Sequence, residues 1–183
     1  DLVKDVLNDM PTVKTLIWSN QGAGKPPVND QFRDFDAWYK KYPAKEPEAI
    51  LHIEDPVQMT YTSGTETLPK GVIISNQALM AQYMGAIIDG QYDEDDISIN
   101  ALPIYHCAQR DVFMNPIFWV GGTNVLLVPD IGQILKNIAA YKATIFFAPP
   151  TVWIGMLRHP DFSKYDLSSL KKCYYGASIM PVE

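Results

Sequence analysis

The sequence predicts an α/β protein with a mainly parallel sheet and flanking helices. Short apolar segments alternate with segments of about ten to fifteen residues whose apolar side chains recur at helical spacing, as βαβ units require. The composition, with 47% hydrophobic and 20% charged residues, lies in the ordinary globular range. Because ligands of such sheets bind beyond the carboxyl ends of the strands, the loops that follow the strands are the first candidates for a functional site.

Residues 1–56 predict a lead-in strand, a helix and a linker. Residues 13–18 alternate as a strand does, and Asn29 or Asp30 can cap a helix that ends before Pro43. The Lys, Glu and Pro residues of segment 43–47 indicate a linker. We expect the aromatic side chains on one face of this helix to form core or packing surface: Phe32, Phe35, Trp38, Tyr39 and Tyr42.

Residues 57–183 carry the regular alternation of strands and helices. We expect a short buried strand at 57–61 and further strands at 97–102, 124–128, 144–148 and 172–175. We expect helices at 111–119, 131–142 and 151–157, and an earlier helix capped by Asn76. That earlier helix should turn six apolar side chains inward: Leu79, Met80, Tyr83, Met84, Ile87 and Ile88. The acidic run 93–96 is most simply a solvated turn, with a metal site as the alternative.

Charge and cysteine usage exclude several classes of function. The chain has 15 Lys and Arg against 21 Asp and Glu, a net charge of −6, which argues against nucleic acid or anionic lipid as a partner. No apolar stretch is long enough to span a membrane, and we expect a soluble protein. Cys107 and Cys173 have no metal-binding spacing and cannot form a disulfide framework, so we expect a reducing, cytoplasmic location.

Segment 62–71, which follows the first of these strands, has the composition of a phosphate-binding loop. It reads Thr-Ser-Gly-Thr-Glu-Thr-Leu-Pro-Lys-Gly. Backbone amides made accessible by Gly, hydroxyl donors and one lysine suit phosphate oxygens. A purely structural turn is the alternative, because Gly, Ser and Thr are also common in turns.

The order of residues in this segment resembles the phosphate-binding loop of the adenylate-forming superfamily, whose pattern is roughly [ST]-S-G-T-[TE]-x-x-P-K-G. This superfamily includes acyl-CoA synthetases, peptide-synthetase adenylation domains and luciferases. Glu66 stands where fatty-acyl ligases of the family have a similar variant. The resemblance implies that the loop binds ATP phosphates through these residues: Thr62, Ser63, Gly64, Thr65, Glu66, Thr67, Lys70 and Gly71. It also implies that Thr65 binds Mg²⁺.

Segment 102–106 resembles a second motif of this family, L-P-x-[FY]-H. The resemblance implies that His106 lies near the acyl substrate and the α-phosphate and acts in catalysis; a structural His with a backbone partner is the alternative. Gln109 stands where a Gly is common, which resembles the subgroup that acts on fatty or aryl acids.

A third resemblance lies after the last strand, where Gly176, Ala177 and Ser178 are similar to the family segment that packs on adenine. A tight strand-to-helix turn is the alternative. Segment 148–152 resembles the turn that leads into a substrate-pocket helix. Trp153 and Met156 of this helix face either an acyl pocket or the core.

Together the motifs imply that residues 57–183 are the central part of the large N-terminal domain of an adenylate-forming enzyme, and that the chain is an incomplete piece, inactive alone. The implied activity converts a fatty or aryl carboxylic acid and ATP to an acyl-adenylate, which then passes to coenzyme A. The implied ligands are ATP, Mg²⁺ and coenzyme A, and a homodimer is possible. Adenylation with another acceptor, and a non-catalytic nucleotide-binding module, are the alternatives.

Overall fold

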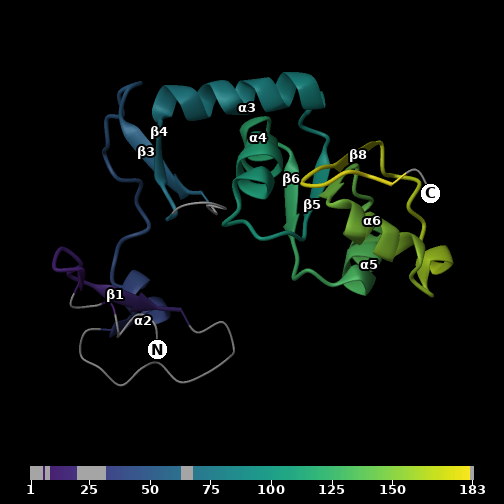
Figure 1. Cartoon of the computed structure of the whole chain (residues 1–183), viewed down its shortest axis with the longest axis horizontal. Coiled ribbons are helices and arrows are strands. Elements are labelled where there is room, and N and C mark those ends of the chain that lie inside the picture. Colours follow the sequence, from purple (N-terminus) through teal and green to yellow (C-terminus); the bar gives the residue numbers. More distant parts are fainter. Residues whose placement is uncertain (1–5, 7–8, 20–31, 63–67, 182–183) are drawn as a thin grey trace. The chain divides into compact units, whose positions relative to one another are not determined.

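The computed structural model describes residue 6 and residues 9–19, 32–62 and 68–181 (Figure 1). The chain divides into two compact units, Asp1–Ile50 and Leu51–Glu183. No helix among the described residues is long and apolar enough to cross a membrane.

In the first unit, strand β1 (Leu16–Trp18) pairs in parallel with strand β2 (Phe32–Asp34), and helix α2 (Phe35–Tyr39) follows directly. The prediction of one helix across 32–42 was therefore wrong. The helix begins later because the carboxylate of Asp34 accepts a hydrogen bond from the Ala37 N–H at 2.9 Å and caps it. The proposed caps, Asn29 and Asp30, lie outside the described residues.

The aromatic side chains of this segment pack on one another without forming a buried core. The rings of Phe35 and Tyr39 lie 5.2 Å apart, and those of Trp38 and Tyr42 lie 5.3 Å apart. Phe35, Tyr39 and Tyr42 nevertheless stay exposed. Within the described part of this unit they form a packing surface.

The second unit starts with an antiparallel hairpin of β3 (Pro56–Tyr61) and β4 (Gly71–Ser75). We expected a short buried strand at 57–61; the strand is present, but the prediction that it is buried was wrong. The strand is largely exposed and belongs to a separate two-stranded sheet. The segment that joins β3 to β4 is shorter than the dozen or more residues that a parallel crossover needs, so the partners run antiparallel.

Helix α3 (Asn76–Gly90) begins at the residue that was predicted to be its N-cap, Asn76. Ser75, and not Asn76, is the N-cap, and its Oγ accepts a hydrogen bond from the Ala78 N–H at 3.3 Å. Tyr83 is buried as expected, whereas Met84 and Ile88 are 56% and 70% exposed, contrary to the prediction. The apolar face of α3 is thus only partly covered within the described residues.

A four-stranded sheet forms the centre of the second unit and confirms the predicted parallel α/β fold. Its strands are β5 (Ile97–Asn100), β6 (Thr123–Leu126), β7 (Ile145–Ala148) and β8 (Lys172–Tyr175), all parallel, in the order β6-β5-β7-β8. Between β5 and β6 lie a π-helix, η2 (Ala108–Met114), and helix α4 (Asn115–Trp119). Helices α5 (Ile131–Tyr141) and α6 (Pro150–Leu157) and the 3₁₀ turn η3 (Phe162–Lys164) complete the unit.

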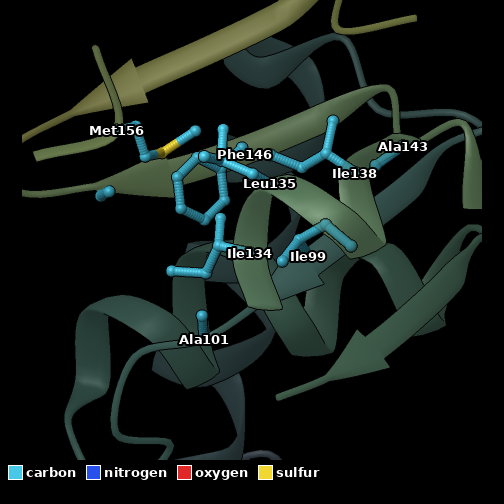
Figure 2. Close-up of a cluster of buried hydrophobic side chains, with 9 residues drawn as sticks. Ile99, Ala101, Ile134, Leu135, Ile138, Ala143, Phe146 and Met156 are labelled. Carbon is cyan, nitrogen blue, oxygen red and sulfur yellow. The ribbon is translucent and has the colours of Figure 1, made fainter. Parts of the chain in front are cut away.

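Alternating residues of β5 and β7 face two layers of helices. On one face, Phe146 and Ile99 pack with apolar residues of α5 and with Met156 of α6 (Figure 2). On the other face, Phe147 packs with Phe113 of η2 and Ile117 of α4, and the rings of Phe147 and Phe113 stack 4.2 Å apart. Because both faces are covered, β7 is apolar throughout, as strands of parallel sheets usually are.

The amino ends of the strands are joined by a buried ion pair. The ammonium of Lys172 donates to a carboxylate oxygen of Asp96 at 2.5 Å, and the hydroxyl of Thr144 donates to the other oxygen at 2.7 Å. Asp96 is only 3% exposed, so the prediction that run 93–96 is simply solvated was wrong for its last residue. Its carboxylate links segments that precede β5 and β7 to the first residue of β8.

Candidate functional site

The hairpin of β3 and β4 closes on two hydrogen bonds at the base of the predicted phosphate loop. The Thr62 N–H donates to the carbonyl oxygen of Lys70 at 3.0 Å, and the Lys70 N–H donates to the hydroxyl oxygen of Thr62 at 3.1 Å. These bonds hold Thr62 and Lys70 side by side, with both side chains exposed. The central residues of the predicted loop lie outside the described residues: Ser63, Gly64, Thr65, Glu66 and Thr67.

Gly71 allows the two strands to approach closely at this base. A Cβ atom placed on Gly71 would lie 3.2 Å from the sulfur of Met59 and 3.4 Å from the ring of Tyr61. The glycine is therefore used in hairpin packing.

His106 lies in the turn that follows β5, at the carboxyl edge of the sheet. Its backbone N–H donates to the Pro103 carbonyl at 3.0 Å, and its Nδ1 accepts from the Ala108 N–H at 3.2 Å. The ring thus has the backbone partner that a structural role requires, yet His106 is exposed. With Nδ1 as an acceptor, the neutral ring carries its proton on Nε2, which is the nitrogen available to a ligand.

Two adjoining pockets share Tyr105 and His106. The larger, of about 530 Å³, lies between this turn and the hairpin and includes Thr62 and Cys107 in its wall. The smaller, of about 260 Å³, lies over the carboxyl ends of the strands and reaches Ala177. Three of the predicted site residues, Thr62, His106 and Ala177, are therefore brought to one connected region.

The turn after β8 holds the third predicted motif. Ala177 has a φ of 66°, in the left-handed region that residues with a Cβ rarely adopt. A Cβ placed on Gly176 would lie 3.4 Å from the ring of Phe147, so this residue packs closely on the sheet. Ser178 is exposed. The turn is tight, as the structural alternative required, and it also forms part of a pocket wall.

Trp153 and Met156 belong to the core. The Trp153 indole donates its N–H to the Tyr174 carbonyl at 3.0 Å and packs against the ring of Phe146, with centroids 5.0 Å apart. Met156 is 1% exposed within the same cluster. Of the two alternatives for these side chains, the structure favours core packing.

Sequence reasoning missed the part that Gln109 has in the smaller pocket. Gln109 lines this pocket, is 1% exposed and donates from Nε2 to the side-chain oxygen of Asn100. Its Oε1 has no hydrogen-bond partner among the described residues. The signal was present in the sequence, because a long polar side chain stands where the resembling motif commonly has Gly.

Asp111 of the π-helix η2 links this helix to the hairpin through a hydrogen bond. It accepts hydrogen bonds from Gln58 Nε2 at 2.9 Å and from the guanidinium of Arg110 at 2.9 and 3.0 Å. Burial opposes the charge on this carboxylate, but the bonds from Arg110 and Gln58 outweigh it and lower the pKa of Asp111 below its ordinary value. Asp111 thus holds β3, and with it Thr62, near the turn that carries His106.

The chain matches the family described as AMP-binding enzyme over residues 2–183. It is 34% identical over 128 residues to the long-chain-fatty-acid–CoA ligase of Bacillus subtilis, a match that covers 68% of this chain and 23% of that protein. It is 31% identical over 137 residues to 4-coumarate–CoA ligase 4 of Arabidopsis thaliana, covering 71% of this chain and 24% of that protein. The chain thus spans about a quarter of the length of these curated relatives.

Two solved structures share the fold. ATP-bound MatB from Rhodopseudomonas palustris superposes with a TM-score of 0.62 at 26% identity, over 69% of this chain and 25% of that one. The anthranilate CoA ligase AuaEII, in complex with anthranoyl-AMP, superposes with a TM-score of 0.78 at 24% identity, over 98% of this chain and 35% of that one. At that identity the second likeness shows the fold alone.

Proposed function

The chain belongs to the AMP-binding enzyme family, and from this premise we propose that the protein of which it is a part is an ATP-dependent acyl-CoA synthetase. The observation that carries the proposal is the meeting of Thr62, His106 and Ala177 around two adjoining pockets at the carboxyl edge of a parallel sheet. The curated relatives, which are named as CoA ligases, support the same conclusion.

The proposed reaction has two steps. In the first, a carboxylate oxygen of the acid attacks the α-phosphorus of ATP, the bond from that phosphorus to the bridging oxygen breaks, and pyrophosphate leaves. In the second, the sulfur of coenzyme A attacks the acyl carbon, AMP leaves with the oxygen of the cleaved bond, and the thiol proton is released to solvent. Positioning and charge neutralisation account for most of the catalysis that the protein must supply in the first step.

Each motif has a role in this proposal. The loop based on Thr62 and Lys70 binds the β- and γ-phosphates, and the exposed Lys70 ammonium supplies the positive charge. His106 donates from Nε2 to the carboxylate or the α-phosphate, because its Nδ1 is held by the Ala108 N–H. The segment Gly176–Ser178 packs on the adenine, and the carbon skeleton of the acid occupies the apolar smaller pocket.

A Mg²⁺ ion, when bound, would neutralise charge on the pyrophosphate leaving group. The residues described supply no group of three or more His, Cys, Asp or Glu side chains that could hold a metal. The proposed ligand, Thr65, lies outside them. When ATP is bound, its phosphates would supply most of the oxygen ligands of a Mg²⁺ ion, as is usual for this metal.

The acid is proposed to be fatty or aryl, since the relatives are named for long-chain fatty acids and for 4-coumarate. The cytoplasmic location and the homodimer expected from the sequence remain predictions.

The test is acid-dependent exchange of pyrophosphate into ATP by the full-length protein, followed by thioester formation with coenzyme A. We expect both, with fatty or aryl acids. Exchange without transfer to coenzyme A would instead indicate another acceptor, and binding of ATP without exchange would indicate a non-catalytic module.

Replacement of Lys70 by Ala sharpens this test. We expect Lys70→Ala to weaken ATP use by about tenfold to a hundredfold, because a charge-assisted contact to phosphate is worth about 1.5–3 kcal/mol. Lys171→Ala is the matched control, since Lys171 is also exposed but precedes β8 at the opposite edge of the sheet. An unchanged KM for ATP in Lys70→Ala would contradict the assignment of the phosphate loop.

A further inference from the structure

A chain of amide side chains beneath the smaller pocket has a fixed direction. Asn124 Nδ2 donates to the backbone carbonyl of Met114 at 3.0 Å, which can only accept. The Asn124 side-chain oxygen therefore faces Asn100, whose Nδ2 donates to it at 2.7 Å and also to the Ser98 carbonyl at 3.3 Å. Two backbone carbonyls thus determine which way the Asn100 amide points.

This direction passes on to Gln109. Because Asn100 uses its Nδ2 on Asn124 and Ser98, its oxygen faces Gln109 and requires a donor there. Gln109 supplies Nε2 to this oxygen, which leaves Oε1 without a partner among the described residues. The assignment of nitrogen and oxygen in Gln109 is therefore a consequence of the network, and the atom left without a described partner is a hydrogen-bond acceptor.

Gln109 is also the one deeply buried polar side chain in the described wall of the smaller pocket. The other polar members of this wall, Tyr105 and His106, are exposed. The rest of the wall is apolar and includes Leu102, Phe147 and Pro149. Such a wall receives a carbon skeleton, whereas a buried acceptor without a partner is costly unless a ligand satisfies it.

We propose that Gln109 determines specificity and that the acid of this enzyme carries a hydroxyl or amino group whose hydrogen is donated to Gln109 Oε1. The proposal rests on the proposed function and names its substrate class, an acid with a hydrogen-bond donor on its skeleton. Oε1 is closed to water in the unliganded pocket. A donor reaches it when the terminal torsion of Gln109, which is soft in glutamine, turns Oε1 toward the pocket.

The helical turn that follows β5 places this acceptor close to the proposed reaction centre. The Arg110 N–H donates to the His106 carbonyl at 3.3 Å, so residues 106–110 form one turn. His106 and Gln109, three positions apart on that turn, are neighbours. One end of the acid would then meet His106 while a donor on its skeleton meets Gln109.

The experiment compares acids in pairs that differ by one donor, using the full-length enzyme. The pairs are 4-hydroxycinnamate with cinnamate, 2-aminobenzoate with benzoate, and 12-hydroxydodecanoate with dodecanoate. Pyrophosphate exchange gives kcat/KM for each acid, and the shift in melting temperature on adding each acid gives a second readout that does not need turnover. We expect the donor-bearing member of at least one pair to be favoured by about tenfold to a hundredfold, the effect of one buried hydrogen bond.

Gln109→Met removes the acceptor and keeps the length of the side chain. We expect it to abolish the preference within the pair and the extra melting shift. Gln82→Met is the matched control, because Gln82 is exposed on α3 and is absent from the wall of this pocket. It should leave the preference intact.

Other outcomes overturn the proposal. If Gln109→Met raises the KM for ATP equally with every acid, the acceptor serves the amino group of adenine. If it changes only the melting temperature of the unliganded enzyme, Gln109 is purely structural. If no acid supports exchange, the proposed function is wrong, and the donor preference is then tested by the melting shifts alone. Equal melting shifts within every pair would overturn the donor preference as well.

Discussion

The two edges of the four-stranded sheet differ in whether their buried polar groups have hydrogen-bond partners. At the amino edge, Asp96 is buried and both of its oxygens accept hydrogen bonds, from Lys172 and Thr144. At the carboxyl edge, Gln109 is equally buried but its Oε1 has no described partner, and Ala177 has a left-handed backbone. Satisfied groups contribute stability, whereas unsatisfied and strained ones are typical of sites completed by a ligand. The comparison assigns stability to the amino edge and binding to the carboxyl edge.

Electrostatics at the amino edge support this division. Burial opposes the charge on Asp96, but its hydrogen bonds to Lys172 and Thr144 outweigh burial and lower the pKa of Asp96. Burial likewise disfavours the charge on Lys172, but the contact with Asp96 outweighs it and raises the pKa of Lys172. Each partner therefore favours the charged form of the other, and the pair should stabilise the fold over a broad pH range.

The largest effect on stability should come from Lys172→Met, which leaves the Asp96 carboxylate buried without its cation. We expect a loss of about 3 kcal/mol in the free energy of unfolding, measured by denaturant titration. Lys171→Met, which alters an exposed neighbour, should change it by less than about 0.5 kcal/mol. An equal loss of stability in both variants would contradict the assignment of stability to the amino edge of the sheet. So would a Lys172→Met variant whose activity falls further than its folded fraction.

A second effect should appear on acidification. The pKa of Asp96 is lowered on folding, so its contribution is complete above its ordinary value near 3.8 and is lost as the pH falls through the lowered folded value. We expect Asp96→Asn to be less stable than wild type by about 2 kcal/mol at neutral pH, and this difference to shrink below pH 3.8. Melting temperatures from pH 2 to pH 7 measure it. A difference that grows on acidification would contradict the assigned direction.

The smallest effect is expected at the carboxyl edge. Ala177→Gly removes the Cβ that makes a φ of 66° unfavourable, and it should stabilise the protein by about 0.5–1 kcal/mol. Ala81→Gly, in the exposed interior of α3, should destabilise it by up to about 1 kcal/mol. Thermal unfolding should show changes in stability of opposite sign for the two variants. A loss of stability in both would contradict the inference that the backbone at Ala177 is strained.

Much of the fold could be predicted from the sequence because its signals are local. The apolar run of β7 and the helical periodicity of α5 lie where expected, since β7 is buried over its whole length and α5 buries one face, which carries Ile134, Leu135 and Ile138. The antiparallel partner of β3 was missed because its pairing depends on a contact between strands that no local pattern reveals. The helix at 32–42 was wrong because the Asp34 cap outweighs the aromatic periodicity before it.

The candidate site was only partly predictable for a similar reason. His106 and Ala177 could be singled out because each belongs to a motif of consecutive residues. The role of Gln109 depends on Asn100 and Asn124, which lie on two different strands and meet only in the folded sheet. The same holds for Asp96 and Lys172, which are 76 residues apart in sequence. Polar networks of this kind are properties of the tertiary structure.

The central claim, that the carboxyl edge carries out adenylation without contributing much to stability, is tested most directly at His106. His106→Ala should lower acid-dependent pyrophosphate exchange by about a hundredfold while changing the free energy of unfolding by less than about 0.5 kcal/mol. His52→Ala, at another exposed histidine, should change neither quantity. Parallel loss of stability and exchange in His106→Ala, or undiminished exchange in a folded variant, would contradict the account.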